Sequence, residues 1–374
     1  MIRVVREEAA TLTGLLVFAI LTAVGSSLSV DAIGGIGSTV VLSMLFAVMM
    51  WCSFAAVHHA EALATLLGEP FGTLILTLAV IIIEVALISA VMLTGADSPT
   101  VARDTMMAVL MIAMNLLVGI SLVLGGIRHK AQVYNLQGAN TFLAVLIPLA
   151  VFSLIFPSFT ESAPGGQVSV LQGIYLTLAS VVLYGIFLTV QTTTHSDLFR
   201  QPTDLAAEAD GGAADSGHGH EAPHSGLYHA IALVGSLIPV ILLAKKFAGY
   251  LDHIIVLAGA PLALGGLLVA VLILTPEGLS AIRAARENSL QRAVNLCLGS
   301  ALASIGLTVP AVIGISWLIS EPLELGLGVV QSMLLILTLL VSMVTFVSAR
   351  TNVMQGAVHL ALFFGYVMYM FDST

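Results

Sequence analysis

The chain has 374 residues, of which 58% are hydrophobic and only 9% are charged. Soluble globular domains carry about 25% charged residues, so this composition indicates a protein built for lipid and excludes an ordinary soluble domain. The net charge is −9, but six acidic residues fall within 195–227, so the total says little about partners. The twelve Lys and Arg residues form no basic stripe, which argues against a nucleic-acid partner. The two cysteines, Cys52 and Cys297, lie in apolar runs and are expected to be buried thiols.

Apolar runs long enough to span a membrane recur along the chain. A spanning helix needs about 20 mostly apolar residues. This rule predicts eleven segments, near 11–30, 38–60, 70–95, 104–127, 139–157, 168–193, 228–248, 253–282, 290–319, 323–348 and 352–371. We interpret the first segment as a spanning helix and not as a cleaved signal, because no small-x-small cleavage site clearly follows its apolar run. The predicted fold class is an all-α polytopic membrane protein surrounded by membrane lipid.

The basic residues set the predicted orientation, because cytoplasmic loops keep the excess of Lys and Arg. With the N-terminus inside, nine basic residues fall in inner loops and three fall in outer loops. The inner ones are Arg3, Arg6, Arg128, Lys130, Arg200, Arg283, Arg286, Arg292 and Arg350, and the outer ones are Arg103, Lys245 and Lys246. We therefore expect an integral protein of a bacterial cytoplasmic (inner) membrane, with its N-terminus in the cytoplasm and its C-terminus outside.

The longest polar stretch separates the chain into two halves. Residues 195–227 read "HSDLFRQPTDLAAEADGGAADSGHGHEAPHSGL", and their Gly, Ala, Asp and Ser content is typical of a flexible linker, here acidic and cytoplasmic. A solvated linker is the favoured interpretation, and metal sensing stays open for His218, His220, His224, Asp215 and Glu221. The predicted organisation is an N-terminal transmembrane helix (1–37), a first five-helix repeat (38–194), the linker (195–227) and a second five-helix repeat (228–374).

Two acidic residues lie inside apolar segments at matching places. Glu84 follows Gly72 by twelve residues in "GTLILTLAVIIIEVALISA", and Glu277 follows Gly265 by twelve residues in "GGLLVAVLILTPEGLSAI". Each glutamate is in the second helix of its five-helix half. Because five is an odd number, the second half enters the membrane inverted relative to the first, which is the plan of many transporters. The sequence therefore predicts that Glu84 and Glu277 meet near the membrane midplane.

Polar residues in the helix after each glutamate are candidate supporting ligands. They are Asn115 in the first half and Asn295, Ser300 and Ser304 in the second half. Serine hydroxyls in membrane helices usually bond the carbonyl one turn back, so a structural role is favoured for each serine taken singly.

Other polar residues have different expected roles. His58, His59 and Glu61, at the predicted cytoplasmic end of the second segment, are candidates for proton entry, with a solvated helix end as the alternative. His359, in "AVHLALFF", is expected to be a buried packing residue. No cofactor is expected.

The two glutamates suggest a mechanism from physical chemistry alone. A carboxylate in the middle of a spanning helix costs about 2.5–3.5 kcal/mol on insertion scales, so the group prefers its neutral form until a cation supplies the counter-charge. Two such groups facing one cavity hold protons or a divalent cation but hardly both, so each ligand expels the other. This coupling favours a secondary transporter of inorganic cations and protons that exports cations by alternating access. The sequence leaves a homo-oligomer open.

Three stretches carry a resemblance to a known family. They are "HHAEALATLLGEPFGTLILTLAVIIIEV" (58–85), "GGIRHKAQVYNLQGAN" (125–140) and "TPEGLSAIRAARENSLQRAVNLCLGSALASIGLTVP" (275–310). On these stretches the chain resembles the Ca²⁺/H⁺ antiporter branch of the cation/Ca²⁺ exchanger superfamily, and most closely the bacterial ChaA-type calcium (sodium/potassium)/proton antiporters. The resemblance covers nearly the whole chain. It implies Ca²⁺/H⁺ exchange, one extra helix plus two inverted five-helix repeats, and Glu84 and Glu277 as cation-binding and proton-coupling residues.

Three alternatives stay open at this point. Na⁺/H⁺ or K⁺/H⁺ antiport on the same site is the first, because the positions that hold Gly-Asn in the wider branch read Ile81-Ile82 and Leu274-Thr275 here. Fewer neutral oxygens then remain to complete the six to eight ligands that Ca²⁺ takes. A cation channel is a distant alternative, since a channel usually repeats one filter around a ring of subunits. An intramembrane enzyme is another, but "HHAEALA" lacks the second histidine at metalloprotease spacing.

Overall fold

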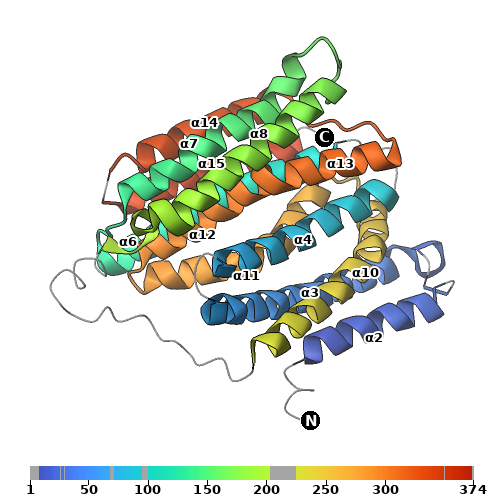
Figure 1. Ribbon diagram of the computed structural model, residues 1–374. Coiled ribbons are helices and arrows are strands. Elements are labelled where there is room, and N and C mark those ends of the chain that lie inside the picture. Colours follow the sequence, from blue (N-terminus) through green and yellow to red (C-terminus); the bar gives the residue numbers. More distant parts are fainter. Residues whose placement is uncertain are drawn as a thin grey trace. The chain divides into compact units, whose positions relative to one another are not determined.

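The computed structural model describes residues 8–25, 27–28, 30–67, 71–94, 100–202, 225–348 and 350–372 of the protein (Figure 1). These residues form helices, with two isolated β-bridges and no strand among them. Among the described residues, nine helical stretches are long and apolar enough to cross a membrane. Two shorter apolar helices, α2 (Ala9–Ala23) and α14 (Val329–Thr345), accompany them. Together they match the eleven predicted segments in order, so the all-α polytopic fold is confirmed.

The helices divide into two compact units. Unit 1 holds α2, α3 (Val30–Leu67), α4 (Phe71–Thr94), α10 (Gly226–Ala258) and the part of α11 (Ala263–Arg286) up to Pro276. Within this unit α10 packs along α3, and both contact α4 and α2 (Figure 1). The buried apolar core of the unit includes Leu45 and Met49 of α3 with Leu243 and Phe247 of α10. Unit 1 thus combines helices from both predicted repeats.

Unit 2 begins at Ala102 and resumes at Glu277. Its first span joins three elements end to end, and its other spans follow in chain order. The elements are α5 (Val101–Met111), η1 (Ile112–Leu117), α6 (Val118–His129), α7 (Leu136–Ala150), η2 (Val151–Ile155), η3 (Phe156–Phe159), α8 (Val170–Thr189), η4 (Val190–Thr194), η5 (Ser196–Phe199), α12 (Leu290–Ala303), η6 (Ser304–Thr308), α13 (Val309–Ile319), α14 and α15 (Val353–Asp372). Within the unit α6 packs against α15, α7 against α12, and α8 against α13.

Small residues allow a close contact between two helices of unit 2. A Cβ atom on Gly356 of α15 would lie 2.7 Å from the carbonyl oxygen of Gly119 and 2.8 Å from the backbone nitrogen of Val123, both in α6. A Cβ atom on Gly119 would in turn lie 2.8 Å from Cγ of Leu360. In lipid, helices associate through van der Waals packing at small residues, because burial of apolar surface gives no driving force between them. These two glycines therefore set the α6–α15 distance.

Several predicted segment ends differ from the ends of the helices, and two of these differences have a clear physical cause. The break predicted between 248 and 253 lies instead after α10, which continues to Ala258. Gly259 ends the helix in a left-handed conformation (φ 60°, ψ 30°), and Pro261 follows. Gly249 does not break α10, because an isolated glycine inside a helix keeps its backbone hydrogen bonds and costs only about 1 kcal/mol relative to alanine.

The second wrong end is the start of the segment predicted at 323–348. Its helix, α14, begins at Val329. The preceding stretch follows a left-handed Ser320 and contains Pro322, and its Glu324 forms an isolated bridge with Gln167. The extended segment before α14 also contains apolar residues, so apolar composition alone does not locate the start of the helix.

Gly356→Ala is expected to destabilise unit 2, because the new methyl group overlaps backbone atoms of α6. Backbone atoms cannot rotate away as a flexible side chain can, so the two helices must separate. Overpacking of this kind costs about 1–3 kcal/mol, so the midpoint of thermal unfolding in detergent should fall. Gly365→Ala, in the same helix, is the matched control, because a Cβ atom there meets nothing within 4 Å. Equal midpoints for the two variants would contradict the packing account.

Candidate functional site

Glu84 lies in the interior of α4. This helix has 24 residues, and Glu84 is the fourteenth of them. At a rise of 1.5 Å per residue, the glutamate is about 20 Å from the start of the helix and about 15 Å from its end. Its side chain is fully buried, with 0% exposure. A carboxyl group at this depth of unit 1 is shielded from bulk water.

Glu277 occupies the corresponding place in α11. This helix also has 24 residues, and Glu277 is the fifteenth. Its side chain is 9% exposed and accepts a hydrogen bond from the hydroxyl of Ser300 in α12. The predicted segment 253–282 placed Glu277 near a segment end, and this placement is wrong because α11 continues to Arg286. Both glutamates are therefore interior residues of spanning helices of equal length.

The turn that carries Glu277 packs directly on the span that contains Asn115. A Cβ atom on Gly278 would lie 2.7 Å from Cδ2 of Leu117, the last residue of η1. Pro276, on the other side of Glu277, has no backbone N–H and removes one hydrogen bond from the helix. The backbone around Glu277 is thus both weakened by proline and held by contact with η1.

Each helix that follows a glutamate contains a wide π-helical turn in its middle. η1 begins 28 residues after Glu84, and η6 begins 27 residues after Glu277. Single π-turns inside α-helices are rare and occur often at functional sites. The nearly equal spacing agrees with an internal repeat, and it marks the middle of these two spans as a specialised part of the fold.

Asn115 lies in η1 and is fully buried. Its Nδ2 donates to Oγ1 of Thr338 at 2.8 Å, and its Oδ1 lies 3.0 Å from Nδ1 of His359. Nε2 of the same histidine lies 3.0 Å from Oγ1 of Thr345. Asn115 therefore connects its own span to α14 and α15, and its predicted role as a cation ligand stays a prediction. The expectation that His359 is a buried packing residue agrees with its place in this network.

The other candidate ligands occupy different levels of the span α12–η6–α13. Ser300 contacts Glu277, as described above. Ser304 is the first residue of η6 and is 3% exposed. Asn295 accepts from Nε2 of Gln291 at 2.8 Å and donates to the carbonyl oxygen of Phe199 at 2.7 Å, so both ends of its amide are engaged near the start of α12. Direct ligation by these three residues stays a prediction.

The three candidates for proton entry differ in exposure. His58 is exposed, Glu61 is half-buried, and His59 is 3% exposed. His59 contacts Glu8 and His229, neither of which the sequence analysis singled out. A signal for His229 was available, since it lies at the edge of an apolar span much as His59 does. Proton entry through these residues stays a prediction.

Two further regions bear on metal and cation binding. The predicted metal-sensing side chains of the linker, at 215, 218, 220, 221 and 224, lie outside the described residues. Within the described residues, no group of three or more His, Cys, Asp or Glu side chains is arranged to hold a metal ion.

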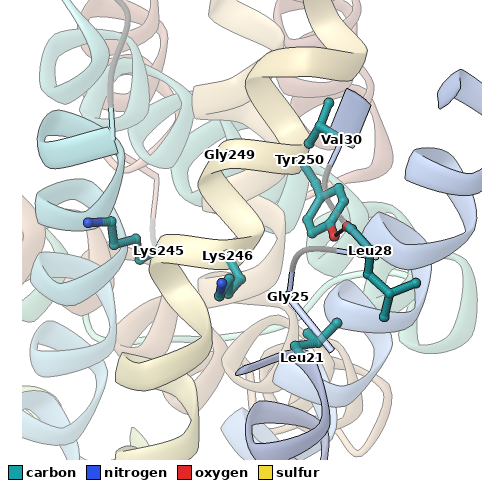
Figure 2. Close-up of a pocket in the computed structure, with 8 residues that line it drawn as sticks. All are labelled: Leu21, Gly25, Leu28, Val30, Lys245, Lys246, Gly249 and Tyr250. Atoms are coloured by element: carbon teal, nitrogen blue, oxygen red, sulfur yellow. Dashed lines mark hydrogen bonds between the residues drawn. The ribbon is translucent and has the colours of Figure 1, made fainter. Parts of the chain in front are cut away.

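A pocket of about 310 Å³ opens in unit 1 and is lined by Leu21, Gly25, Leu28, Val30, Lys245, Lys246, Gly249 and Tyr250 (Figure 2). Figure 2 shows the two lysine side chains pointing in different directions from α10, and the hydroxyl of Tyr250 directed at Leu28, whose carbonyl oxygen it bonds. The lining carries ammonium groups and no carboxylate. Its charge does not suit a cation, so this pocket is not the transport site.

Comparison with known proteins gives three agreeing results. A family model described as sodium/calcium exchanger protein matches residues 37–193 and 228–371. The sodium-potassium/proton antiporter ChaA of Escherichia coli (strain K12) is 43% identical over 319 residues, which are 85% of each chain. The putative ionic transporter y4hA of Sinorhizobium fredii (strain NBRC 101917 / NGR234) is 44% identical over 327 residues, which are 87% of each chain.

A solved structure has the same fold. The structure of native YfkE matches with a TM-score of 0.70 and 17% sequence identity, covering 95% of this chain and 99% of its own. A second structure of YfkE, described as a Ca²⁺/H⁺ antiporter protein, gives a TM-score of 0.65. At this sequence identity the likeness establishes the helical architecture and nothing finer.

Asn115→Leu is expected to lower the stability of unit 2. The variant removes the amide and leaves the hydroxyl of Thr338 and Nδ1 of His359 buried without that partner, which costs about 1–3 kcal/mol per group. Thermal unfolding in detergent measures the change. Ser121→Ala is the control: Ser121 is 2% exposed in the same span, and its hydroxyl bonds no described residue. A loss of equal size in both variants would argue against the network.

Proposed function

We propose that this chain, which belongs to the sodium/calcium exchanger family, exchanges Ca²⁺ for protons by alternating access around Glu84 and Glu277. Members of the family are secondary transporters, so the protein is an integral membrane transporter of inorganic cations and protons and not an enzyme. The observation that carries the proposal is the pair of buried glutamates, each at the middle of a 24-residue spanning helix. No cofactor takes part in the proposed exchange.

The chemistry of two buried carboxyl groups supports coupled exchange. Each group costs free energy when it is charged in a medium of low dielectric constant, so it needs either a proton or a cation. A divalent cation balances two carboxylates, and two protons balance them equally well. Because the two ligands compete for the same charges, binding of one favours release of the other. The proton gradient of a bacterial inner membrane then drives cation export.

Ser300 has a specific place in this proposal. Its hydroxyl is bonded to the Glu277 carboxyl, so it can donate to the charged form and offer an oxygen lone pair to a cation. Ca²⁺ takes six to eight oxygen ligands, more than two carboxyl groups provide. Hydroxyls, amides, backbone carbonyls freed near Pro276 and water are the proposed remainder. Irregular backbone of this kind is tolerated at membrane depth where it lines a site.

Na⁺ or K⁺ is the second candidate cargo. It is favoured by the name of the Escherichia coli relative, a sodium-potassium/proton antiporter that is 43% identical. The same two glutamates serve either cargo, since a monovalent cation replaces one proton where Ca²⁺ replaces two. The cation that releases protons identifies the cargo directly.

The topology proposed from the sequence completes the account. We place the N-terminus in the cytoplasm and the C-terminus outside, because nine of twelve basic residues then lie in inner loops. The two stretches that match the family model, 37–193 and 228–371, are separated by the linker, which supports two repeats of five helices as the unit of transport. A homo-oligomer stays open.

Glu84→Gln and Glu277→Gln are each expected to abolish exchange. Glutamine keeps the shape of the side chain but neither ionises nor releases a proton. The assay uses inverted membrane vesicles with an acid-inside proton gradient, followed by a pH-sensitive dye after addition of Ca²⁺, Na⁺ or K⁺. Wild-type protein should dissipate the gradient on addition of the transported cation, and both variants should be silent at equal expression.

Glu287→Gln is the matched control for this experiment, since Glu287 is exposed just beyond the end of α11 and should exchange cations normally. If Na⁺ or K⁺ releases protons and Ca²⁺ does not, the transported cation is Na⁺ or K⁺, and the two glutamates are still the binding site. Wild-type behaviour of both glutamine variants at 84 and 277 would show that the glutamates are structural.

Ser300→Ala is expected to weaken cation binding without abolishing exchange. A hydrogen bond to a charged group contributes about 1.5–3 kcal/mol, so the cation concentration for half-maximal exchange should rise by about tenfold or more. Ser300→Thr, which keeps the hydroxyl, should restore most of the affinity. If alanine and threonine behave alike, the hydroxyl has no part in the site.

A further inference from the structure

Four polar side chains meet where three helices of unit 1 lie together. Glu8 is the N-cap residue of α2, His59 is in α3, and Tyr228 and His229 are in the first turn of α10. Nε2 of His59 lies 3.3 Å from Oε1 of Glu8, and the hydroxyl of Tyr228 donates to the same oxygen at 2.6 Å. Nδ1 of His59 lies 3.1 Å from Nδ1 of His229. The two imidazoles therefore face each other through equivalent nitrogens.

The cluster lies at one end of its helices and is shielded from water. His229 is the fourth residue of α10, and His59 is nine residues from the end of α3 counted inclusively. His59 and His229 are 3% and 2% exposed, and the Glu8 side chain is 17% exposed. The start of α2, the end of α3 and the start of α10 thus share one face of the membrane, the face of the N-terminus.

The Nδ1–Nδ1 contact limits how many protons the pair can hold. With both rings neutral, His59 donates its Nε2–H to Glu8, and its Nδ1 lone pair accepts the Nδ1–H of His229. One added proton keeps a single hydrogen between the two Nδ1 atoms, and the Glu8 carboxylate balances its charge. A second added proton places an N–H on both Nδ1 atoms, so neither nitrogen can accept, and two positive charges face each other.

We propose that His59 and His229 form a binding site for one shared proton, separate from the two glutamates, and that a second proton opens the junction of α3 with α10. The junction is closed with no added proton or with one. Unit 1 contains Glu84, so this site lets acidity on the N-terminal face act on the unit that carries the first glutamate, without occupying the transport site.

The direction of the pH effect follows from the hydrogen-bond count. In the closed junction the two imidazoles cannot both be protonated. When the junction opens and the rings separate, each imidazole can take up its own added proton. The contact therefore stabilises the junction at neutral and alkaline pH, and this contribution is lost as the pH falls. Among the described residues, three titratable groups contact the pair. Glu8 at the N-cap of α2 contacts His59, and the ring centre of His58 from α3 is 5.5 Å from that of His59. The ring centre of Tyr228 from α10 is 6.0 Å from that of His59 and 5.3 Å from that of His229.

The chain contains its own reporter for this junction. Cys52 of α3 is fully buried, and its thiol bonds the carbonyl oxygen of Ala10 in α2. A Cβ atom on Gly14 of α2 would lie 2.9 Å from Sγ of Cys52 and 2.6 Å from Cβ of Pro239 in α10. Cys52 thus lies where α2, α3 and α10 meet, and it is reached by a thiol reagent only when these helices separate.

The experiment measures labelling of Cys52 by N-ethylmaleimide in the full-length Cys297→Ala protein in detergent. The rate is divided by that of the same protein unfolded at each pH, which removes the intrinsic pH dependence of the thiol. From about pH 8 to about pH 5, which brackets the usual histidine range, the relative rate should rise. Loss of one hydrogen bond predicts a rise of about fivefold to tenfold.

His229→Asn in the same background should abolish the rise. The asparagine amide takes the place of Nδ1, donates to neutral His59 and accepts from protonated His59, so it holds the junction closed throughout. His59→Asn likewise leaves one imidazole, so the pair cannot take up a second proton. It is the substitute variant if His229→Asn does not fold. His58→Asn, which changes the exposed neighbour, should keep the wild-type rise. Labelling of wild type that does not change with pH, a rise that persists in His229→Asn, or a rise that His58→Asn also removes would overturn the proposal.

Discussion

The constraint on which this structure depends is the cost of a carboxyl group in the middle of a lipid-spanning helix. Glu84 and Glu277 are each more than ten ångströms from either helix end by the helical rise, and neither is more than 9% exposed. A carboxyl group at that depth is stable as the neutral acid, or as a carboxylate with a cation beside it. In the proposed exchange, the surroundings of the two glutamates must therefore admit a proton or a cation.

The spans that follow the glutamates in the chain contain irregular backbone. A regular α-helix satisfies every carbonyl internally and offers none to a ligand. Two of the departures are the π-turns η1 and η6, each in the middle of a span of unit 2, and a third is Pro276, which precedes Glu277. Close contact between Gly278 and Leu117 holds one such turn against the glutamate helix. One π-turn thus lies against the helix turn that carries Glu277.

The sequence predicts the helices well, because a lipid bilayer requires each spanning helix to have about 20 mostly apolar residues. Such a run is visible in the sequence even where a single polar residue interrupts it. Glu84 and Glu277 stand out for the same reason, as acids inside apolar runs. The predicted break after α10 is misplaced because Gly249 and Gly259 are both glycines in apolar surroundings. Only Gly259 takes a left-handed conformation, before Pro261, and the sequence alone does not distinguish the two. The start of α14 was misplaced because an apolar stretch can approach a helix in extended form.

Polar partners of the buried side chains were beyond the reach of sequence for a different reason. Asn115 bonds Thr338 and His359, which are 223 and 244 residues away, and His59 faces His229 at a separation of 170 residues. No local pattern encodes such pairs; they follow from which helices lie side by side. In lipid, an amide or imidazole without a partner is costly, so each of these residues demands a partner without specifying which one. Tertiary packing determines the partner. It thereby decides whether a buried histidine links helices through hydrogen bonds, as His359 does, or shares a proton with a second histidine, as we propose for His59 and His229.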